Sequence, residues 1–307
     1  MPEIAKQAQS IGDLIGRAIR LYRQNFLIIV QVLLLPSAGA TLGKIGLQWG
    51  LIHIKETSIF LPAVLCMAIG FALSLWFLWV LTLRQVGLVK LLESDGLSFS
   101  VAYQAVKKRG WAIFFIFLLT HLMVFANVAL FIAELVVLAV AANVASINHV
   151  FLAVMGMLGF VGGCVGAIYA TLFTFVAFAS VALTNQKFGP LLKETFALLG
   201  RDLKRASWFV ILLSIGLAAM VPPLTLPLMG LTLVDAMKPR AAAEAWLGNG
   251  QYSLFTLVVA QSWESLINMV IWPIMFFAHG LLYRDLKMRQ HASDLLLELE
   301  RLEIKRA

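Results

Sequence analysis

The chain has 307 residues, of which 61% are hydrophobic and only 13% are charged, and its mean hydropathy is +0.90. Soluble domains average about 45–50% apolar and about 25% charged residues, so this composition excludes an ordinary soluble domain and indicates a chain that crosses a membrane several times. A net charge of +8 would suggest nucleic acid binding in a soluble protein, but the positions of these charges follow membrane topology, so no nucleic-acid partner is expected.

Six apolar runs are each long enough to cross the hydrocarbon core, for which a helix needs about 20 residues. They cover roughly residues 26–50, 59–83, 111–133, 150–183, 207–234 and 256–282. If the N-terminus is cytoplasmic, only four of the 24 Lys and Arg residues lie in opposite-side segments, namely Lys44, Lys55, Lys238 and Arg240. This bias predicts a multi-pass protein of the bacterial inner (cytoplasmic) membrane, with both termini in the cytoplasm and anionic lipid headgroups bound at that face.

An amphipathic segment followed by basic residues, an aromatic residue and an apolar run occurs three times. In the copy from Leu97 to Leu119, the cations Lys107, Lys108 and Arg109 are followed, after one glycine, by Trp111. Such a pattern predicts a helix on the membrane surface followed by a span. The fold class is therefore an all-α integral membrane protein, with six transmembrane helices arranged as three repeats of an amphipathic interfacial helix plus a transmembrane hairpin.

These repeats form a single polytopic domain, 1–307, with repeat-like units at about 11–90, 97–185 and 188–290. Because identity between the copies is low, two explanations stand: true duplication, or convergence of the basic and aromatic flanks that every inner-membrane helix requires.

Two spans carry glycines at helical spacing. They are Gly39, Gly43 and Gly46 in span one, continued by Gly50, and Gly156, Gly159 and Gly163 in span four, continued by Gly166. A face of small residues lets another backbone approach closely. Close packing within the bundle is the expected use, and a self-association face is the alternative.

Span five contains Pro222, Pro223 and Pro227. Prolines remove backbone donors and clash with the preceding turn, so we expect a helix break there, whose freed carbonyls are buried in protein or meet water. A simple kink is the milder alternative.

Span six holds the most polar intramembrane stripe, formed by Gln261, Glu264, Ser265 and Asn268. A bare carboxylate within a span costs at least ~2.5 kcal/mol on insertion scales, so Glu264 should face the bundle interior or a wet cavity. Two interpretations follow: hydrogen bonds that lock helices together, or a polar lining for a small solute or lipid headgroup.

The last residues, 293–306, have leucines at helical spacing, with Ser293 as a plausible cap and Asp294 in the first turn. They predict a cytoplasmic amphipathic helix that docks on the protein's own basic surface helices or on a partner.

Two short segments indicate a family. IGDLIGRAIRLYRQNF (11–26) and LLYRDLKMRQHASDL (281–295) resemble the membrane domain associated with glycerophosphoryl diester phosphodiesterases and the related uncharacterised six-helix bacterial inner-membrane proteins. Tyr283, Asp285, Leu286 and Arg289 fit that family's signature after the last span, whereas Arg284 stands where a second aromatic residue is usual. The resemblance implies six helices. The phosphodiesterase of that family is a separate soluble barrel with a His-Arg-Gly motif, and this sequence has no such motif.

The sequence carries no metal-ligand spacing, no Gly-x-Ser-x-Gly elbow and no phosphate-binding loop. We therefore expect no enzyme activity and no cofactor. The favoured function is a non-catalytic scaffold, an accessory subunit of a membrane protein complex or a lipid-organising protein, whose partners are other membrane proteins or a second copy. The alternative is a channel or transporter that uses the broken span five and the polar face of span six.

Overall fold

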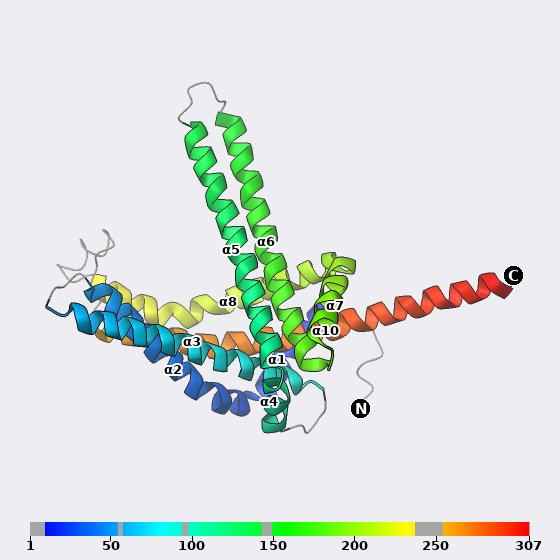
Figure 1. Cartoon of the computed structure of the whole chain (residues 1–307), viewed down its shortest axis with the longest axis horizontal. Coiled ribbons are helices and arrows are strands. Elements are labelled where there is room, and N and C mark those ends of the chain that lie inside the picture. Colours follow the sequence, from blue (N-terminus) through cyan, green and yellow to red (C-terminus); the bar gives the residue numbers. More distant parts are fainter. Residues whose placement is uncertain (1–9, 55–57, 94–97, 143–148, 237–253, 307) are drawn as a thin grey trace. The chain divides into compact units, whose positions relative to one another are not determined.

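The computed structural model describes residues 10–54, 58–93, 98–142, 149–236 and 254–306. Within these ranges the chain forms nine helices and no strand (Figure 1). The helices are α1 (Ile11–Gln24), α2 (Phe26–His53), α3 (Phe60–Lys90), α4 (Phe99–Lys107), α5 (Gly110–Ala142), α6 (His149–Leu183), α7 (Phe188–Arg201), α8 (Leu203–Ala236) and α10 (Leu254–Arg306).

Six of these helices are long and apolar enough to cross a membrane, which confirms the predicted number of spans. The spanning segments are Phe26–His53, Phe60–Lys90, Gly110–Val140, Val154–Leu183, Leu203–Gly230 and Phe255–Ala292. Large apolar side chains on them are open to the surroundings; Phe125 and Leu130 of α5, for example, are 71% and 72% exposed. Lipid, rather than water, is the solvent that suits such surfaces. The chain is a multi-pass membrane protein.

Three short helices, α1, α4 and α7, precede long ones, as the sequence pattern predicts. At the start of α1, Ser10 Oγ accepts a hydrogen bond from the Asp13 amide at 3.1 Å and donates one to the Asp13 carboxylate at 2.6 Å. This reciprocal arrangement satisfies an amide that the first turn leaves without a helical partner. Placement of the three short helices on the membrane surface, and the threefold repeat, stay predictions.

Two compact units make up the fold. The first, called here the α2–α3 unit, comprises Ile15–Gln104 and Leu213–Ala278; the second, the α5–α6 unit, comprises Met1–Leu14, Ala105–Leu212 and His279–Ala307. Each unit combines segments that are distant in sequence, and their boundaries differ from those of the predicted repeats.

In the α2–α3 unit, glycines set the distance between the two long helices of the hairpin (Figure 1). A Cβ atom added to Gly39 would lie 2.5 Å from the Phe77 ring, and one added to Gly43 would lie 2.6 Å from the Ser74 amide nitrogen. Gly46 has more room, with its nearest neighbour at 3.4 Å. Helix α3 thus packs against the glycine face of α2, at a distance that larger side chains would prevent.

In the α5–α6 unit, polar side chains of α5 lie on the glycines of α6. The Glu134 carboxylate occupies the position that a Cβ on Gly159 would take, and Asn127 lies against Gly166. Asn127 Nδ2 also donates to the Gly163 carbonyl at 3.1 Å. Gly156 faces Leu138. The stripe in span four therefore accommodates two polar residues of the neighbouring helix.

Helix α10 corrects one expectation. Residues 293–306 are helical, but they continue α10 without interruption instead of forming a separate helix capped at Ser293. The physical reason lies in the sequence, because no Gly or Pro stands between Leu281 and Arg306 to end the helix.

Candidate functional site

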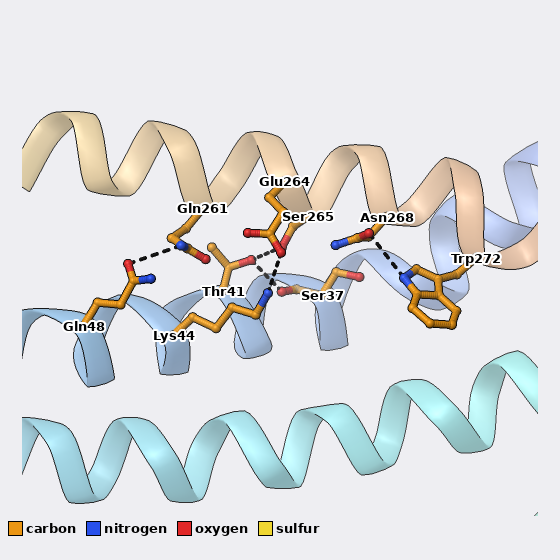
Figure 2. Close-up of polar contacts among 9 residues, drawn as sticks. All are labelled: Ser37, Thr41, Lys44, Gln48, Gln261, Glu264, Ser265, Asn268 and Trp272. Atoms are coloured by element: carbon orange, nitrogen blue, oxygen red, sulfur yellow. Dashed lines mark hydrogen bonds and ion pairs between the residues drawn. The ribbon is translucent and has the colours of Figure 1, made fainter. Parts of the chain in front are cut away.

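Helix α2 has two different faces. One face, which meets α3, is formed by glycines, namely Gly39, Gly43, Gly46 and Gly50. A polar residue lies two positions before each of these glycines; the four are Ser37, Thr41, Lys44 and Gln48. Two residues correspond to about 200° of helix rotation, so the polar series lies nearly opposite the glycines. The α10 stripe lies along this polar face of α2 (Figure 2).

The contacts pair the two helices side chain by side chain. Gln261 Nε2 donates to Gln48 Oε1 at 3.2 Å, and Lys44 Nζ donates to Glu264 Oε1 at 2.9 Å. One residue after Glu264, the Ser265 hydroxyl is hydrogen-bonded to the Thr41 hydroxyl, which also donates to the Ser37 carbonyl at 2.9 Å. The Glu264 carboxylate, which we expected to require a partner within the membrane, is thus paired with a cation. Its neighbours Gln261 and Ser265 each have a polar partner on α2.

Asn268 differs from the other three residues of the predicted stripe, because the partner it meets lies on its own helix. Its Oδ1 accepts a hydrogen bond from Trp272 Nε1 at 3.2 Å (Figure 2). This contact fixes the indole ring along α10 without joining two helices.

Burial changes across this cluster. Thr41 and Gln261 are buried, at 5% and 9% exposed, whereas the Lys44 and Glu264 side chains are 43% and 47% exposed. The Gln261 Oε1 atom is buried and has no hydrogen-bond partner among the described residues. The cluster is therefore closed on one side and open at the ion pair.

The α2 half of the cluster was absent from the sequence prediction. Lys44 was assigned to an opposite-side segment, but it lies inside α2, nine residues before His53, or about 14 Å at 1.5 Å per residue. The spacing of Ser37, Thr41, Lys44 and Gln48 is the signal that could have identified this face. It matches the spacing of the α10 stripe.

The predicted break at Pro222, Pro223 and Pro227 does not occur in the structure, where α8 is one helix from Leu203 to Ala236. All three prolines are exposed, so their rings meet few neighbours. The prolines leave the carbonyls of Ala218, Ala219 and Pro223 without their intrahelical donors. Two side chains bond to neighbouring carbonyls instead: Thr225 Oγ1 donates to the Pro222 carbonyl at 3.1 Å, and Trp263 Nε1 of α10 donates to the Leu224 carbonyl at 2.6 Å.

The second ionic cluster belongs to the α5–α6 unit and contains the signature residues. Asp285 is 1% exposed, and its Oδ2 atom accepts hydrogen bonds from Arg205 Nε at 2.9 Å and Arg289 Nε at 3.0 Å. Tyr283 and Leu286, which are close to Asp285 in the sequence, are also buried. The part of α10 directly after its apolar run is thus tied to the start of α8.

Glu194 of α7 also belongs to this cluster. Its Oε1 atom lies 2.9 Å from Lys287 Nζ and accepts a hydrogen bond from Tyr283 at 3.1 Å. Burial alone would raise the pKa of Glu194, but the hydrogen bonds and charge of Lys287, together with the Tyr283 hydroxyl, outweigh it and hold the pKa below its ordinary value. Helix α7 is thereby fastened to α10.

Arg109 plays a similar part at the junction of α4 and α5. Its guanidinium donates to the carbonyls of Val181, at 2.6 Å, and of Thr184 and Gln186, which lie at and just beyond the end of α6. Burial lowers the pKa of this arginine, and the carbonyls it meets are those that a helix end leaves without intrahelical donors.

Among the residues that the structure describes, no three His, Cys, Asp or Glu side chains gather closely enough to hold a metal ion. Comparison of the chain with protein-family models, with curated proteins and with solved structures found no match.

Proposed function

We propose that this protein is a non-catalytic scaffold or accessory subunit of a membrane protein complex in the bacterial inner membrane. In this proposal it is a membrane-domain relative of the glycerophosphoryl diester phosphodiesterase family without the phosphodiesterase. Both termini are cytoplasmic, α1, α4 and α7 lie on the cytoplasmic surface, and anionic lipid headgroups contact that face.

The pairing of the α10 stripe with α2 is the observation that supports this function over transport. Gln261, Glu264 and Ser265 each meet a polar side chain of α2. A stripe used in this way joins two helices into a stable surface for partners, because interhelical polar contacts within a membrane help to hold helices together. A solute pathway would instead require polar side chains whose hydrogen-bonding atoms are available to the solute rather than bonded to another helix.

The test is purification of the tagged full-length protein from its native membrane in a mild detergent, followed by mass spectrometry of bound proteins and lipids. We expect a stoichiometric partner, or a defined oligomer, that survives size-exclusion chromatography. A monomer without associated proteins in several mild detergents contradicts the proposal. Accessibility labelling of cysteines placed at each terminus tests the topology independently, and labelling of the two termini from opposite sides contradicts it.

A channel or transporter is the second candidate, and the open side of the cluster favours it. Lys44 and Glu264 are nearly half exposed, and the buried Gln261 Oε1 has no partner among the described residues. Together they could bind a small polar solute. Uptake into proteoliposomes that is lost in Glu264→Gln, while the variant remains folded, would replace the scaffold by this function.

A further inference from the structure

Helix α8 contains backbone carbonyls that have lost their helical donors. In an α-helix, each carbonyl accepts a hydrogen bond from the amide four residues later. For Ala218, Ala219 and Pro223 that later residue is a proline, which has no amide hydrogen. The two side-chain bonds that the structure shows in this stretch go to other carbonyls. Acceptors are therefore available near the middle of a spanning helix.

These carbonyls lie on the exposed side of α8. Ala218 and Ala219 are exposed, and so are Pro222 and Pro223, toward which their carbonyls are directed. A Cβ atom added to Gly216, three residues before Ala219, would have nothing within 4 Å, so this side leaves room for another helix. The hydrocarbon of a membrane supplies no water to a carbonyl. This side of α8 therefore favours a neighbour that brings hydrogen-bond donors.

Helix α3 carries a donor with the complementary requirement. Trp76 is 63% exposed, and its indole Nε1 has no acceptor among the described residues. An indole N–H that is removed from water usually finds an acceptor. Tryptophans are typical of the two membrane interfaces, where water and headgroups accept their hydrogen bonds, but Trp76 lies near the middle of α3, between Phe60 and Lys90. It is thus a donor that requires an acceptor within an apolar span.

The donor and the acceptors lie at a similar depth, measured from the end of each helix that carries basic residues. Trp76 lies fourteen residues before Lys90, the last residue of α3, or about 21 Å at 1.5 Å per residue. Ala219 lies sixteen residues after Leu203, the first residue of α8, or about 24 Å. In the proposed topology both basic ends face the cytoplasm. Two copies side by side therefore bring Trp76 of one to the level of the α8 carbonyls of the other.

We propose that this protein associates with a second copy of itself, and that the Trp76 indole of one copy donates to the carbonyl of Ala218 or Ala219 on α8 of the other. Each group then has the hydrogen-bond partner that hydrocarbon cannot supply, and polar contacts of this kind hold helices together within membranes. The inference rests on the proposed scaffold function, because it names a second copy as one partner and the exposed sides of α3 and α8 as the surfaces used.

The experiment uses full-length protein with a C-terminal fluorescent tag, reconstituted into vesicles of phosphatidylglycerol and phosphatidylethanolamine. Counting photobleaching steps over a range of protein-to-lipid ratios gives the dissociation constant of self-association. Trp76→Phe keeps an aromatic ring and removes the donor. The pair Pro222→Ala and Pro223→Ala returns amide donors to the two carbonyls, and it should not impair folding, because alanine is a better helix former than proline. Trp111→Phe, at a residue that is 76% exposed, is the matched control.

We expect wild type to self-associate and Trp76→Phe to raise the dissociation constant about fivefold, which corresponds to about 1 kcal/mol. The double alanine variant should raise it by a similar factor. Adding Trp76→Phe to the alanine pair should change it little further, since both sets of changes remove the same contact. Trp111→Phe should change it less than about twofold.

A wild-type protein that stays monomeric at every ratio overturns the inference, and so does a loss in Trp76→Phe no larger than that in Trp111→Phe. Additive losses in the combined variant contradict it as well, because the indole and the α8 carbonyls would then belong to separate contacts. If the alanine pair leaves self-association unchanged but reduces the amount of a different co-purified protein, α8 binds that protein rather than a second copy. In that case the inference fails while the scaffold proposal stands.

Discussion

Each of the two units contains a carboxylate that is paired with cationic side chains, but the two carboxylates differ in how deeply they are buried. In the α5–α6 unit, Asp285 is 1% exposed and is held by two arginines. In the α2–α3 unit, Glu264 is 47% exposed and is held by one lysine. An enclosed charge requires several donors because its desolvation is costly, whereas a half-open charge is partly compensated by its surroundings. The first pair should therefore govern folding, and the second should have a smaller effect on it.

Asp285→Ala should be the most damaging of these changes. Removing one partner of a buried ionic cluster costs about 3–5 kcal/mol, since the two arginines remain without their acceptor. The expected result is a large loss of folded protein, measured by fluorescence-detected size exclusion and by the thermal unfolding midpoint. Glu264→Ala is the matched control, and a loss as large as that of Asp285→Ala would remove the contrast between the units.

The glycine face of α2 offers a second comparison, within one helix. Gly43→Ala should destabilise the α2–α3 hairpin by about 1–3 kcal/mol because the new Cβ meets the backbone of α3. Gly46→Ala should have a small effect, since its nearest neighbour is 3.4 Å away. Unfolding of both variants in detergent measures the difference, and equal stability of the two would show that α3 does not pack on this face as described.

The Lys44–Glu264 pair should have a modest effect on stability. A double-mutant cycle with Lys44→Gln and Glu264→Gln should give a coupling free energy below about 1 kcal/mol, because both groups are nearly half exposed. The measurement is the free energy of unfolding of the four proteins in the same lipid–detergent mixture. A coupling of several kcal/mol would indicate that the pair is enclosed in the membrane.

Substitution of Glu194 should have the smallest effect on stability, and the size of that effect depends on pH. Its folded-state pKa lies below the ordinary value of 4.5, so its contribution to stability is fully present above that value and is lost as the pH falls through the folded-state pKa. Between about pH 6 and pH 3, wild type should lose more stability than Glu194→Gln, by an amount that thermal unfolding can detect. Identical pH profiles would contradict the hydrogen-bonded, ionised state of Glu194.

Features that depend on local sequence were the predictable ones. The six spans follow from the length of apolar runs, which one helix satisfies alone. The continuation of α10 past Ser293 could also have been predicted, since no Gly or Pro follows Leu281 before Arg306, although a separate helix was expected there. By contrast, the continuity of α8 through its prolines was not predictable from local sequence, because a proline in a helix interior usually breaks or kinks the helix.

The partners of the α10 stripe were harder to predict because they depend on which helices meet. The stripe itself was visible, and Glu264 could be expected to need a partner. That the partner is Lys44 follows only from the α2–α10 pairing. A search for equal spacing of polar residues on two spans would have suggested it, without excluding other pairs of helices.

The most direct test of the account is the contact between Thr41 and Ser265, the part-buried centre of the α2–α10 pairing. In a protein with Cys66 and Cys164 replaced by alanine, Thr41→Cys combined with Ser265→Cys should form an intramolecular disulfide in most molecules on mild oxidation, with co-purifying proteins retained. Leu35→Cys combined with Ser265→Cys, where Leu35 is 71% exposed, is the control and should not react. Failure of the first pair to form the bond, together with modification of Ser265→Cys by a membrane-impermeant thiol reagent, would show an open aqueous path and contradict the closed pairing.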